Sequence, residues 1–213
     1  MSFVFPKVYP ILDSSILPLS GREDFLHQLG QSLASAGVTL LEYRNKMGSD
    51  SEVLVDARAL RNAMPKLKTK LILDDRAHLV EGSGFDGVHV DAGDLAPGEA
   101  RNLLGPERII GTFGGSEALL AGALALPADY LSIGPVFPTT TKQTSKTPIG
   151  VEGVRRLRKQ AGNKVNLAAV GGIDLATASE ILAAGATTIA VSAAIFRRPD
   201  PAAEFQHWMD VLG

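Results

Sequence analysis

Charged side chains follow the second apolar run of the sequence, in the string "EYRNK". Arg44 and Lys46 are two positions apart and Glu42 lies two positions before Arg44, so all three point to one side of an extended chain. Two cations directed into one space form a site for an anion such as phosphate. Two other interpretations stay open from these residues alone: a solvated pair of cations, or Arg44 held in a salt bridge by Glu42.

Carboxylates and a histidine end the next two runs. The string "LILDDR" supplies Asp74 and Asp75, and "GVHVDAGDL" supplies His89, Asp91 and Asp94. Carboxylates from neighbouring strand ends can meet on one Mg²⁺ ion, which takes one or two of them together with phosphate oxygens and water. Asp91 or Asp94 could instead cap the N-terminus of a helix. His89 lies inside an apolar run, which favours a hydrogen-bonded core histidine over a ligand.

A stretch rich in threonine follows the sixth run. It reads "GPVFPTTTKQTSKTP", spans residues 134–148 and contains no carboxylate. Hydroxyl groups and ammonium groups are suitable partners for phosphate oxygens, and carboxylates would repel such a ligand. Thr139, Thr141 and Lys142 are therefore candidate phosphate contacts. A solvated loop without a ligand is the alternative.

Small residues end the last two runs, in "AVGGID" and "AVSAAI". Gly171 and Gly172 allow close approach of the backbone to a ligand, and Ser192 and Ala193 are small residues beside them. Backbone N–H groups in such positions bind phosphate. Tight packing of small residues is the alternative. Together with the cations, this segment suggests two phosphorylated substrates, or one substrate with a phosphate at each end.

All these polar positions follow short apolar runs that are typical of strands. The runs are Val8–Leu12, Thr39–Arg44, Lys70–Asp75, Gly87–Asp91, Arg108–Phe113, Tyr130–Val136, Asn166–Ile173 and Thr188–Ile195. Segments with helical spacing lie between them, and the clearest cover residues 23–37, 51–64, 150–162 and 174–186. A last helix, "PAAEFQHWMDVL", is expected to pack Phe205 and Trp208 against the rest of the protein.

Eight strand–helix units without a long linker predict an α/β fold with a parallel sheet. We expect a single domain over residues 1–213, a (β/α)8 or TIM barrel, whose chemistry lies at the carboxyl ends of the strands. A doubly wound open sheet is the competing architecture. It is disfavoured because no G-x-G-x-x-G string follows the first run.

Composition excludes several classes of protein. The 213 residues carry a net charge of −2, which gives no support to nucleic-acid or membrane binding. The absence of cysteine excludes disulfides, thiolate metal sites and a cysteine nucleophile. No apolar run approaches the roughly 18 residues of a membrane span, so a soluble cytoplasmic protein is expected. The sequence does not predict the oligomeric state.

Several strings together resemble the thiamine-phosphate synthase family over nearly the whole chain. They are "EYRNK", "LILDDR", "DGVHVDAGDL", "ADYLSIGPVFPTTTK", "AVGGID" and "GATTIAVSAAI", and "GPVFPTTTK" is the most specific of them. The resemblance implies a (β/α)8 barrel that joins hydroxymethylpyrimidine diphosphate to thiazole phosphate and releases diphosphate. It also implies a dissociative reaction, in which the site must stabilise charge on the departing oxygens.

The resemblance assigns roles to individual residues. It implies that Arg44, Lys46 and Lys142 bind the diphosphate and assist its departure, and that Asp75 and Asp94 hold Mg²⁺. The residues implied for the thiazole phosphate are Thr139, Thr141, Gly172, Ser192 and Ala193.

Four positions depart from the pattern of the family. Glu42 stands where glutamine is usual, and Asp74 stands where asparagine contacts diphosphate. In "IIGTFGGS", Phe113 and Gly115 replace the serine and the histidine of a Gly-x-Ser-x-His string. Two alternatives to the synthase follow: a related thiazole tautomerase, which uses that histidine, and a phosphate-binding barrel without catalysis.

Overall fold

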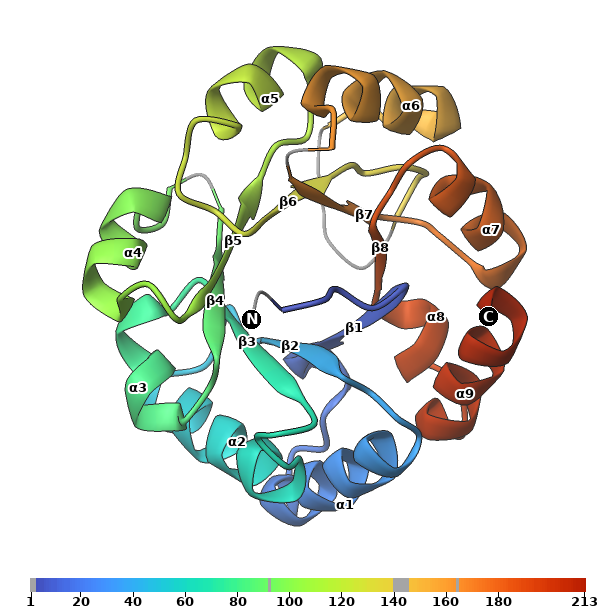
Figure 1. Cartoon of the computed structure of the whole chain (residues 1–213). Helices are drawn as coiled ribbons and strands as arrows, with labels where there is room; N and C mark the ends of the chain where they lie inside the picture. The colour runs from blue at the N-terminus through green and yellow to red at the C-terminus, as the bar shows by residue number, and fades with distance from the viewer. Residues whose placement is uncertain (1–2, 92, 140–145, 164) are drawn as a thin grey trace.

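Eight parallel strands form a closed barrel in the order of the sequence, as the computed structural model of the chain shows (Figure 1). The structure describes residues 3–91, 93–139, 146–163 and 165–213. The strands are β1 (Val8–Asp13), β2 (Leu40–Arg44), β3 (Lys70–Asp74), β4 (Gly87–Val90), β5 (Ile109–Phe113), β6 (Tyr130–Ile133), β7 (Asn166–Val170) and β8 (Thr188–Val191). The predicted (β/α)8 barrel is confirmed, and the open sheet is excluded because β1 pairs with β8.

Helices surround the barrel on all sides (Figure 1). The α-helices are α1 (Arg22–Ser35), α2 (Asp50–Ala63), α3 (Val80–Ser83), α4 (Pro97–Leu104), α5 (Glu117–Ala123), α6 (Gly150–Ala161), α7 (Leu175–Ala183), α8 (Ala193–Phe196) and α9 (Pro201–Leu212). Two 3₁₀ turns, η1 (Ser14–Ile16) and η2 (Ala77–Leu79), complete the described elements. No helix in the described ranges is long and apolar enough to cross a membrane.

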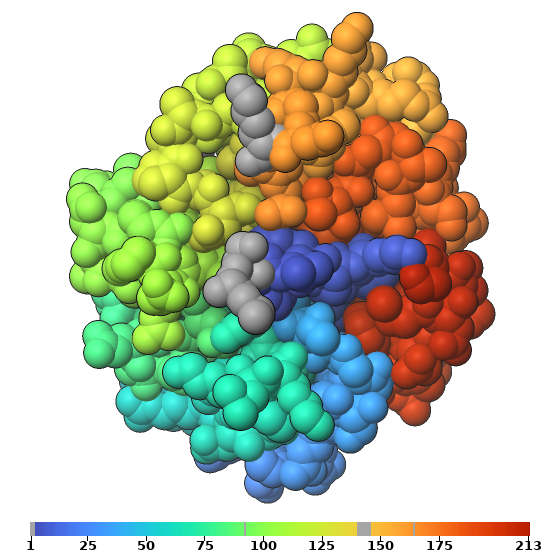
Figure 2. Space-filling model, in the orientation of Figure 1, coloured from blue at the N-terminus to red at the C-terminus, as the bar shows by residue number. Residues whose placement is uncertain are grey.

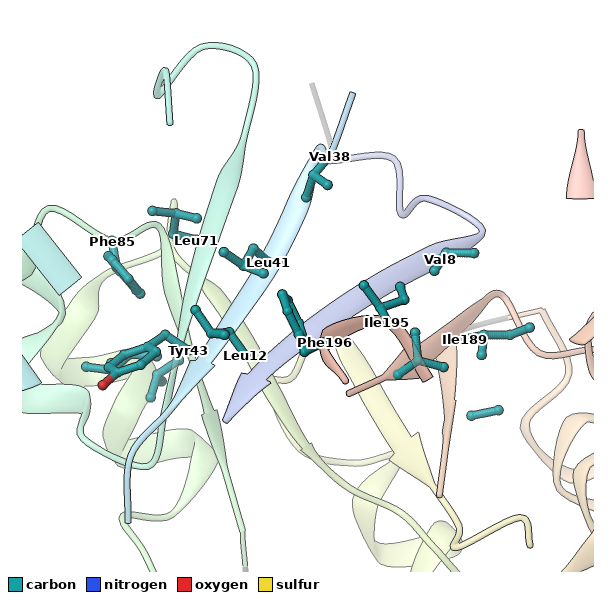
Figure 3. Packing of buried hydrophobic residues seen from close by; sticks show 14 of the residues in the cluster. Val8, Leu12, Val38, Leu41, Tyr43, Leu71, Phe85, Ile189, Ile195 and Phe196 are labelled. Atoms are coloured by element: carbon teal, nitrogen blue, oxygen red, sulfur yellow. The ribbon is translucent and has the colours of Figure 1, made fainter. Parts of the chain in front are cut away.

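Alternate residues of each strand face the helices or the barrel interior, as the two-residue period of a strand requires. On β2, Leu41 and Tyr43 belong to the large apolar cluster between strands and helices, where Leu71 and Phe85 also lie (Figure 3). Leu40 faces the interior instead, in a second cluster with other inward residues: Tyr9, Ile72, Ile109, Tyr130, Ala168 and Ala190. The strands are thus buried on both faces, which explains their nearly continuous apolar sequences.

The N-terminal segment closes the end of the barrel at which the strands begin. It precedes β1 and crosses the centre of the face shown in Figure 2. The ring of Phe5 lies 5.3 Å from that of Tyr130, and Phe3 packs edge-on against Phe5 at 5.2 Å. Lys7 donates hydrogen bonds to the carbonyl groups of the last two residues, which ties the two ends of the chain together.

The run at residues 188–195 is the main difference from the predicted elements. β8 ends at Val191, and Ala193 begins the short helix α8. Ser192 separates the two with φ −119° and ψ −80°. An apolar run does not reveal by periodicity alone where a buried strand ends and a buried helix begins.

The last helix, α9, packs as expected. Pro201 stands in its first turn, and the carboxylate of Asp200 accepts hydrogen bonds from the backbone N–H groups of Ala202 and Ala203. Phe205 and Trp208 are both buried in the large cluster. Burying an aromatic side chain stabilises a fold by about 2–3 kcal/mol, so α9 contributes to holding the barrel together.

Candidate active site

A cavity of about 380 Å³ opens at the carboxyl ends of the strands. It is lined by inward-facing residues at or just beyond these ends. The lining includes Asp13 from β1, Arg44 from β2, Asp74 from β3, Phe113 from β5 and Gly171 after β7. The inward-facing positions of the strands carry apolar side chains in the lower barrel. At the carboxyl ends, the inward-facing positions carry polar side chains instead.

Arg44 and Lys46 lie together at the ends of β2 and β3. The Nε atom of Arg44 is 3.0 Å from Oδ2 of Asp74, and the guanidinium also donates a hydrogen bond to Asp13. The ammonium of Lys46 lies 3.4 Å from the same Asp74 oxygen and contacts the carboxylate of Asp75. The partners of Arg44 are therefore Asp13 and Asp74, in place of the salt bridge with Glu42 that the sequence left open.

These ion pairs leave the corner with an excess of acid, because three carboxylates face two cations. Burial acts to raise the pKa of Asp13, but the hydrogen bonds from Ser15 and Arg44 outweigh it and hold that pKa below its ordinary value. In Asp74 burial prevails and raises the pKa, although Lys46, His89 and Arg44 oppose the rise. An anion that binds here competes with carboxylates for both cations.

A chain of polar groups crosses the floor of the cavity. Tyr9 donates its hydroxyl hydrogen to the carboxylate of Glu42, and its oxygen lies 3.2 Å from the hydroxyl of Tyr130. The Tyr130 hydroxyl is 3.0 Å from Nδ1 of His89, whose Nε2 is 3.4 Å from Oγ of Ser132. All five residues are buried. The floor can therefore offer a polar ligand both donors and acceptors.

Two side chains of this floor, Glu42 and His89, have raised pKa values. Burial raises the pKa of Glu42 to about 7, with a smaller opposing effect of His89. Burial would lower the pKa of His89, but a hydrogen bond to Asp91 and the charges of Glu42 and Asp74 raise it overall. His89 is buried and hydrogen-bonded, which confirms its predicted place as a core histidine.

Backbone dominates the opposite side of the cavity, after β7 and β8. Gly171 and Gly172 have φ values of 96° and 66°, and a Cβ atom on Gly172 would lie 2.4 Å from the carbonyl oxygen of Pro138. Only glycine fits both the conformation and the space. Ser192 and Ala193 line the same side, at the start of α8, where backbone N–H groups lack partners within the helix.

A cation and an aromatic ring meet on the third side, after β5 and β6. The Nζ atom of Lys146 lies 3.3 Å from the centre of the Phe113 ring. Both residues line the cavity, as does Thr139. A cation over the face of an aromatic ring is attracted by the electrons of the ring, so this contact fixes both side chains.

Comparisons with known proteins all point to one family. The family model described as thiamine monophosphate synthase matches residues 8–195. The chain belongs to this family of transferases.

Individual relatives agree with that assignment. The chain is 38% identical to the thiamine-phosphate synthase of Koribacter versatilis over 97% of its own length and 96% of the relative. It is 39% identical to that of Agrobacterium fabrum over 92% and 89%. The solved thiamine phosphate pyrophosphorylase from Pyrococcus furiosus superimposes with a TM-score of 0.83 at 26% identity, covering 97% of this chain and 95% of that one.

The described residues of the cavity that the family resemblance named fall into two groups in space. Arg44, Lys46 and Asp74 meet at the β2–β3 corner, with Asp75 beside them. The residues on the other side of the cavity are Thr139, Gly172, Ser192 and Ala193. Thr141 and Lys142 lie outside the described residues, so their predicted roles stay predictions.

The magnesium ligands predicted for this family member, Asp75 and Asp94, stay predictions, and the structure gives only their surroundings. Asp75 has φ 69°, and its Oδ1 atom is buried without a hydrogen-bond partner, which fits an oxygen directed at a cation. Asp94 accepts a hydrogen bond of 2.9 Å from the backbone of Asp91. The N-cap of α4 is Ala96, so neither aspartate caps that helix. Among the described residues, no group of three or more acidic or histidine side chains converges on one point.

Sequence reasoning missed two charged residues of this site. Asp13 ends β1 and lies directly beside Arg44 in the β1–β2 register. Its position at the end of the first run was a signal that could have been used. Lys146 was visible only as one lysine in a long polar stretch, and nothing in the sequence connected it with Phe113.

Proposed function

We propose that this protein is a thiamine-phosphate synthase that couples hydroxymethylpyrimidine diphosphate with thiazole phosphate. The bond between the methylene carbon and the diphosphate oxygen breaks, and diphosphate leaves with the electron pair. The thiazole nitrogen then donates its electron pair to the carbon, which gives thiamine phosphate. The observation that carries the proposal is a cavity, in a chain of this family, with Arg44 and the adjacent Lys46 on one side and the backbone of Gly171 and Gly172 on the other.

The diphosphate belongs at the β2–β3 corner in this scheme. Arg44 and Lys46 stabilise the charge that grows on the leaving oxygens, and Lys142 is proposed to join them. Removing one such contact costs about 3 kcal/mol, or about a hundredfold in rate. Because Asp13 and Asp74 already occupy the cations, binding must exchange carboxylate contacts for phosphate contacts.

A bound magnesium ion would ease that exchange, and Asp75 and Asp94 are the residues that would hold it. The unpartnered Oδ1 atom of Asp75 supports it as one ligand of the ion, and Asp94 is proposed as the second. When bound, Mg²⁺ supplies positive charge to the diphosphate oxygens. The ammonium of Lys46 contacts Asp75, so this side-chain cation lies beside the proposed ion site.

The floor of the cavity is proposed to orient the pyrimidine ring. Glu42 accepts hydrogen bonds when ionised and can donate one when protonated, and both forms are accessible near neutral pH because its pKa is about 7. Tyr9 holds the Glu42 carboxyl in place. The ring nitrogens and the amino group of the substrate are the complementary partners.

The thiazole phosphate belongs at the β7–β8 side. The backbone at Gly172 and the segment at Ser192 and Ala193 would receive the phosphate oxygens through N–H groups. Thr139 and Thr141 are proposed to add hydroxyl contacts. Both substrates are soluble phosphate esters, so we expect the enzyme to act in the cytoplasm.

The test is a coupling assay with both substrates, with and without Mg²⁺. Formation of thiamine phosphate and diphosphate only in the presence of the metal supports the proposal. Activity that chelation does not reduce would contradict the role of Asp75 and Asp94. Binding of thiazole phosphate without product under any divalent metal would instead favour the binding barrel.

A thiazole carboxylate phosphate tests the tautomerase alternative in parallel. Gly115 removes the histidine on which such tautomerases depend, so we expect no isomerisation. Isomerisation together with a failed coupling assay would reverse the assignment.

A further inference from the structure

The two halves of the cavity wall differ in charge. The half built from β1 to β4 contributes four carboxyl groups to the described lining, from Asp13, Glu42, Asp74 and Asp91, against one permanent cation, Arg44. The half built from β5 to β8 contributes no carboxyl group to the described lining. Its one described lysine or arginine is Lys146. An anion that binds beside Gly171 and Gly172, after β7, therefore meets this half of the wall. In the described lining of this half, the positive side-chain charge comes from Lys146.

Phe113 fixes where that charge lies. Its ring centre is 3.3 Å from Nζ of Lys146, and both side chains line the cavity. Phe113 ends β5, a rigid element, whereas Lys146 belongs to the long connection before α6. A lysine side chain has many rotamers, and holding it in one of them reduces the entropy that is lost when an anion binds.

Gly115 makes room for this arrangement. A Cβ atom on Gly115 would lie 1.7 Å from Cζ of the Phe113 ring. The ring therefore occupies the space that any side chain at position 115 would need. Phe113 and Gly115 thus form a matched pair, and the two departures from the Gly-x-Ser-x-His string have one structural explanation.

We propose that Lys146 is an additional anion-binding residue that contacts the phosphate of the monophosphorylated substrate, and that Phe113 is its positioning residue. The identity of the substrate rests on the proposed function. The placement rests on the charge of the β5–β8 half and on the contact between the ammonium and the ring. Lys146 precedes α6 and follows β6, the neighbour of β7, whereas Arg44 ends β2, four strands from β6 in the closed order.

The first experiment measures steady-state constants of Lys146→Gln, with Lys159→Gln as the matched control. Lys159 is exposed on α6 and does not line the cavity, so the control removes the same charge elsewhere. We expect the KM for thiazole phosphate to rise about tenfold in Lys146→Gln, a typical loss for one charge-assisted phosphate contact. The KM for the diphosphate substrate and kcat should stay within about twofold. Lys146→Arg should restore most of the affinity.

The second experiment tests the positioning role. Phe113→Leu should raise the KM for thiazole phosphate about threefold, because the ring that holds the ammonium of Lys146 is lost. In the Lys146→Gln background, Phe113→Leu should have no further effect, because its only route to the phosphate is gone. Gly115→Ala, which displaces the ring, should reproduce Phe113→Leu.

Titration calorimetry with thiazole phosphate alone separates this inference from the coupling activity. Weaker binding in Lys146→Gln supports the inference even if no coupling occurs. Three outcomes would overturn it: unchanged constants for both substrates in Lys146→Gln, a rise confined to the diphosphate substrate, or independent effects of Phe113→Leu and Lys146→Gln that multiply in the double variant. Thermal unfolding of each variant identifies any loss that comes from misfolding.

Discussion

The two halves of the cavity wall present different chemistry to the anions that we propose they bind. The β1–β4 half uses charged side chains that are already paired with one another, such as Arg44 with Asp13 and Asp74. The β5–β8 half uses backbone at Gly171 and Gly172, with one cation, Lys146, resting on an aromatic ring. The first arrangement is rich in charge and responds to substitution of single side chains, whereas the second depends on space and backbone conformation.

This difference suits two ligands of different charge. A diphosphate leaving group needs strong, localised positive charge that it can take from the carboxylates, and a metal ion adds to it. A monophosphate that remains on the product needs orientation more than charge, and N–H groups of a rigid backbone supply it. Substitutions in each half should therefore affect different substrates and different kinetic constants.

The largest effect is expected for Arg44→Ala. The variant loses a contact to the leaving diphosphate, so kcat/KM should fall about a hundredfold. Buried Asp13 and Asp74 also lose their partner, so the thermal midpoint should fall. Coupling rates and thermal unfolding are measured together. Arg101→Gln is the control, because Arg101 pairs with Asp129 near the opposite end of the barrel. An equal loss of activity in both variants would contradict the assignment.

Lys46→Met tests the second cation of the same half. We expect the KM for the diphosphate substrate to rise about tenfold, with the KM for thiazole phosphate nearly unchanged. The control is Lys70→Met, which removes a lysine paired with Asp86 at the beginning of β3. If Lys46→Met changed the constant of the monophosphate instead, the division between the two halves would be wrong.

Gly172→Ala tests the backbone half. The new methyl group would displace the carbonyl of Pro138, so the KM for thiazole phosphate should rise about tenfold. Gly21→Ala is a close control, because Gly21 has the same φ of 66° and no atom within 4 Å of the added Cβ. Both variants should lose about 1 kcal/mol of stability from the left-handed conformation. Only Gly172→Ala should change the kinetic constants, and an effect in both would point to stability alone.

The smallest effect on activity is expected for Glu42→Gln, at the floor between the halves. Glu42 has a raised pKa of about 7, so the folded state holds a proton between roughly pH 4.5 and pH 7 that the unfolded state has released. The free energy of unfolding of the wild type should therefore fall by about 3 kcal/mol as the pH rises through this window.

Glu42→Gln should lack this part of the pH dependence and should be the more stable form at pH 8. Urea denaturation at pH 5 and pH 8 measures the difference. Parallel pH profiles of the two proteins would show that Glu42 does not titrate in this range. Coupling activity should remain within a fewfold, because the amide keeps both a donor and an acceptor.

The barrel was predictable because parallel strands between helices leave a strong signal. Each strand is buried on both faces, so its sequence is a continuous apolar run, and the helices between them keep their own period. The end of β8 was not predictable, because α8 is as apolar as the strand before it. Ser192 was recognised as a candidate site residue but not as the break between two elements.

The site was predictable where one strand carries the information. Arg44 and Lys46 were found from their spacing, and Gly172 from its place after a strand. Contacts between strands were not predictable in the same way. Asp13 meets Arg44 because of the β1–β2 register, and Lys146, in the connection before α6, meets Phe113 at the end of β5. Such partners depend on tertiary structure, which no local pattern contains.

Aromatic side chains fill the base of the barrel, and the cavity opens at the carboxyl ends of the strands. Phe5 packs against Tyr130 and Phe3 packs edge-on against Phe5, so among the described residues the space above Glu42 is closed at its base. The substrate that binds deepest in the cavity must therefore bind first, and what remains of it must leave last. In the proposed reaction, a pyrimidine cation formed deep in the cavity would be shielded from bulk water by the thiazole phosphate bound above it. Capture by the thiazole nitrogen would then be favoured over capture by water.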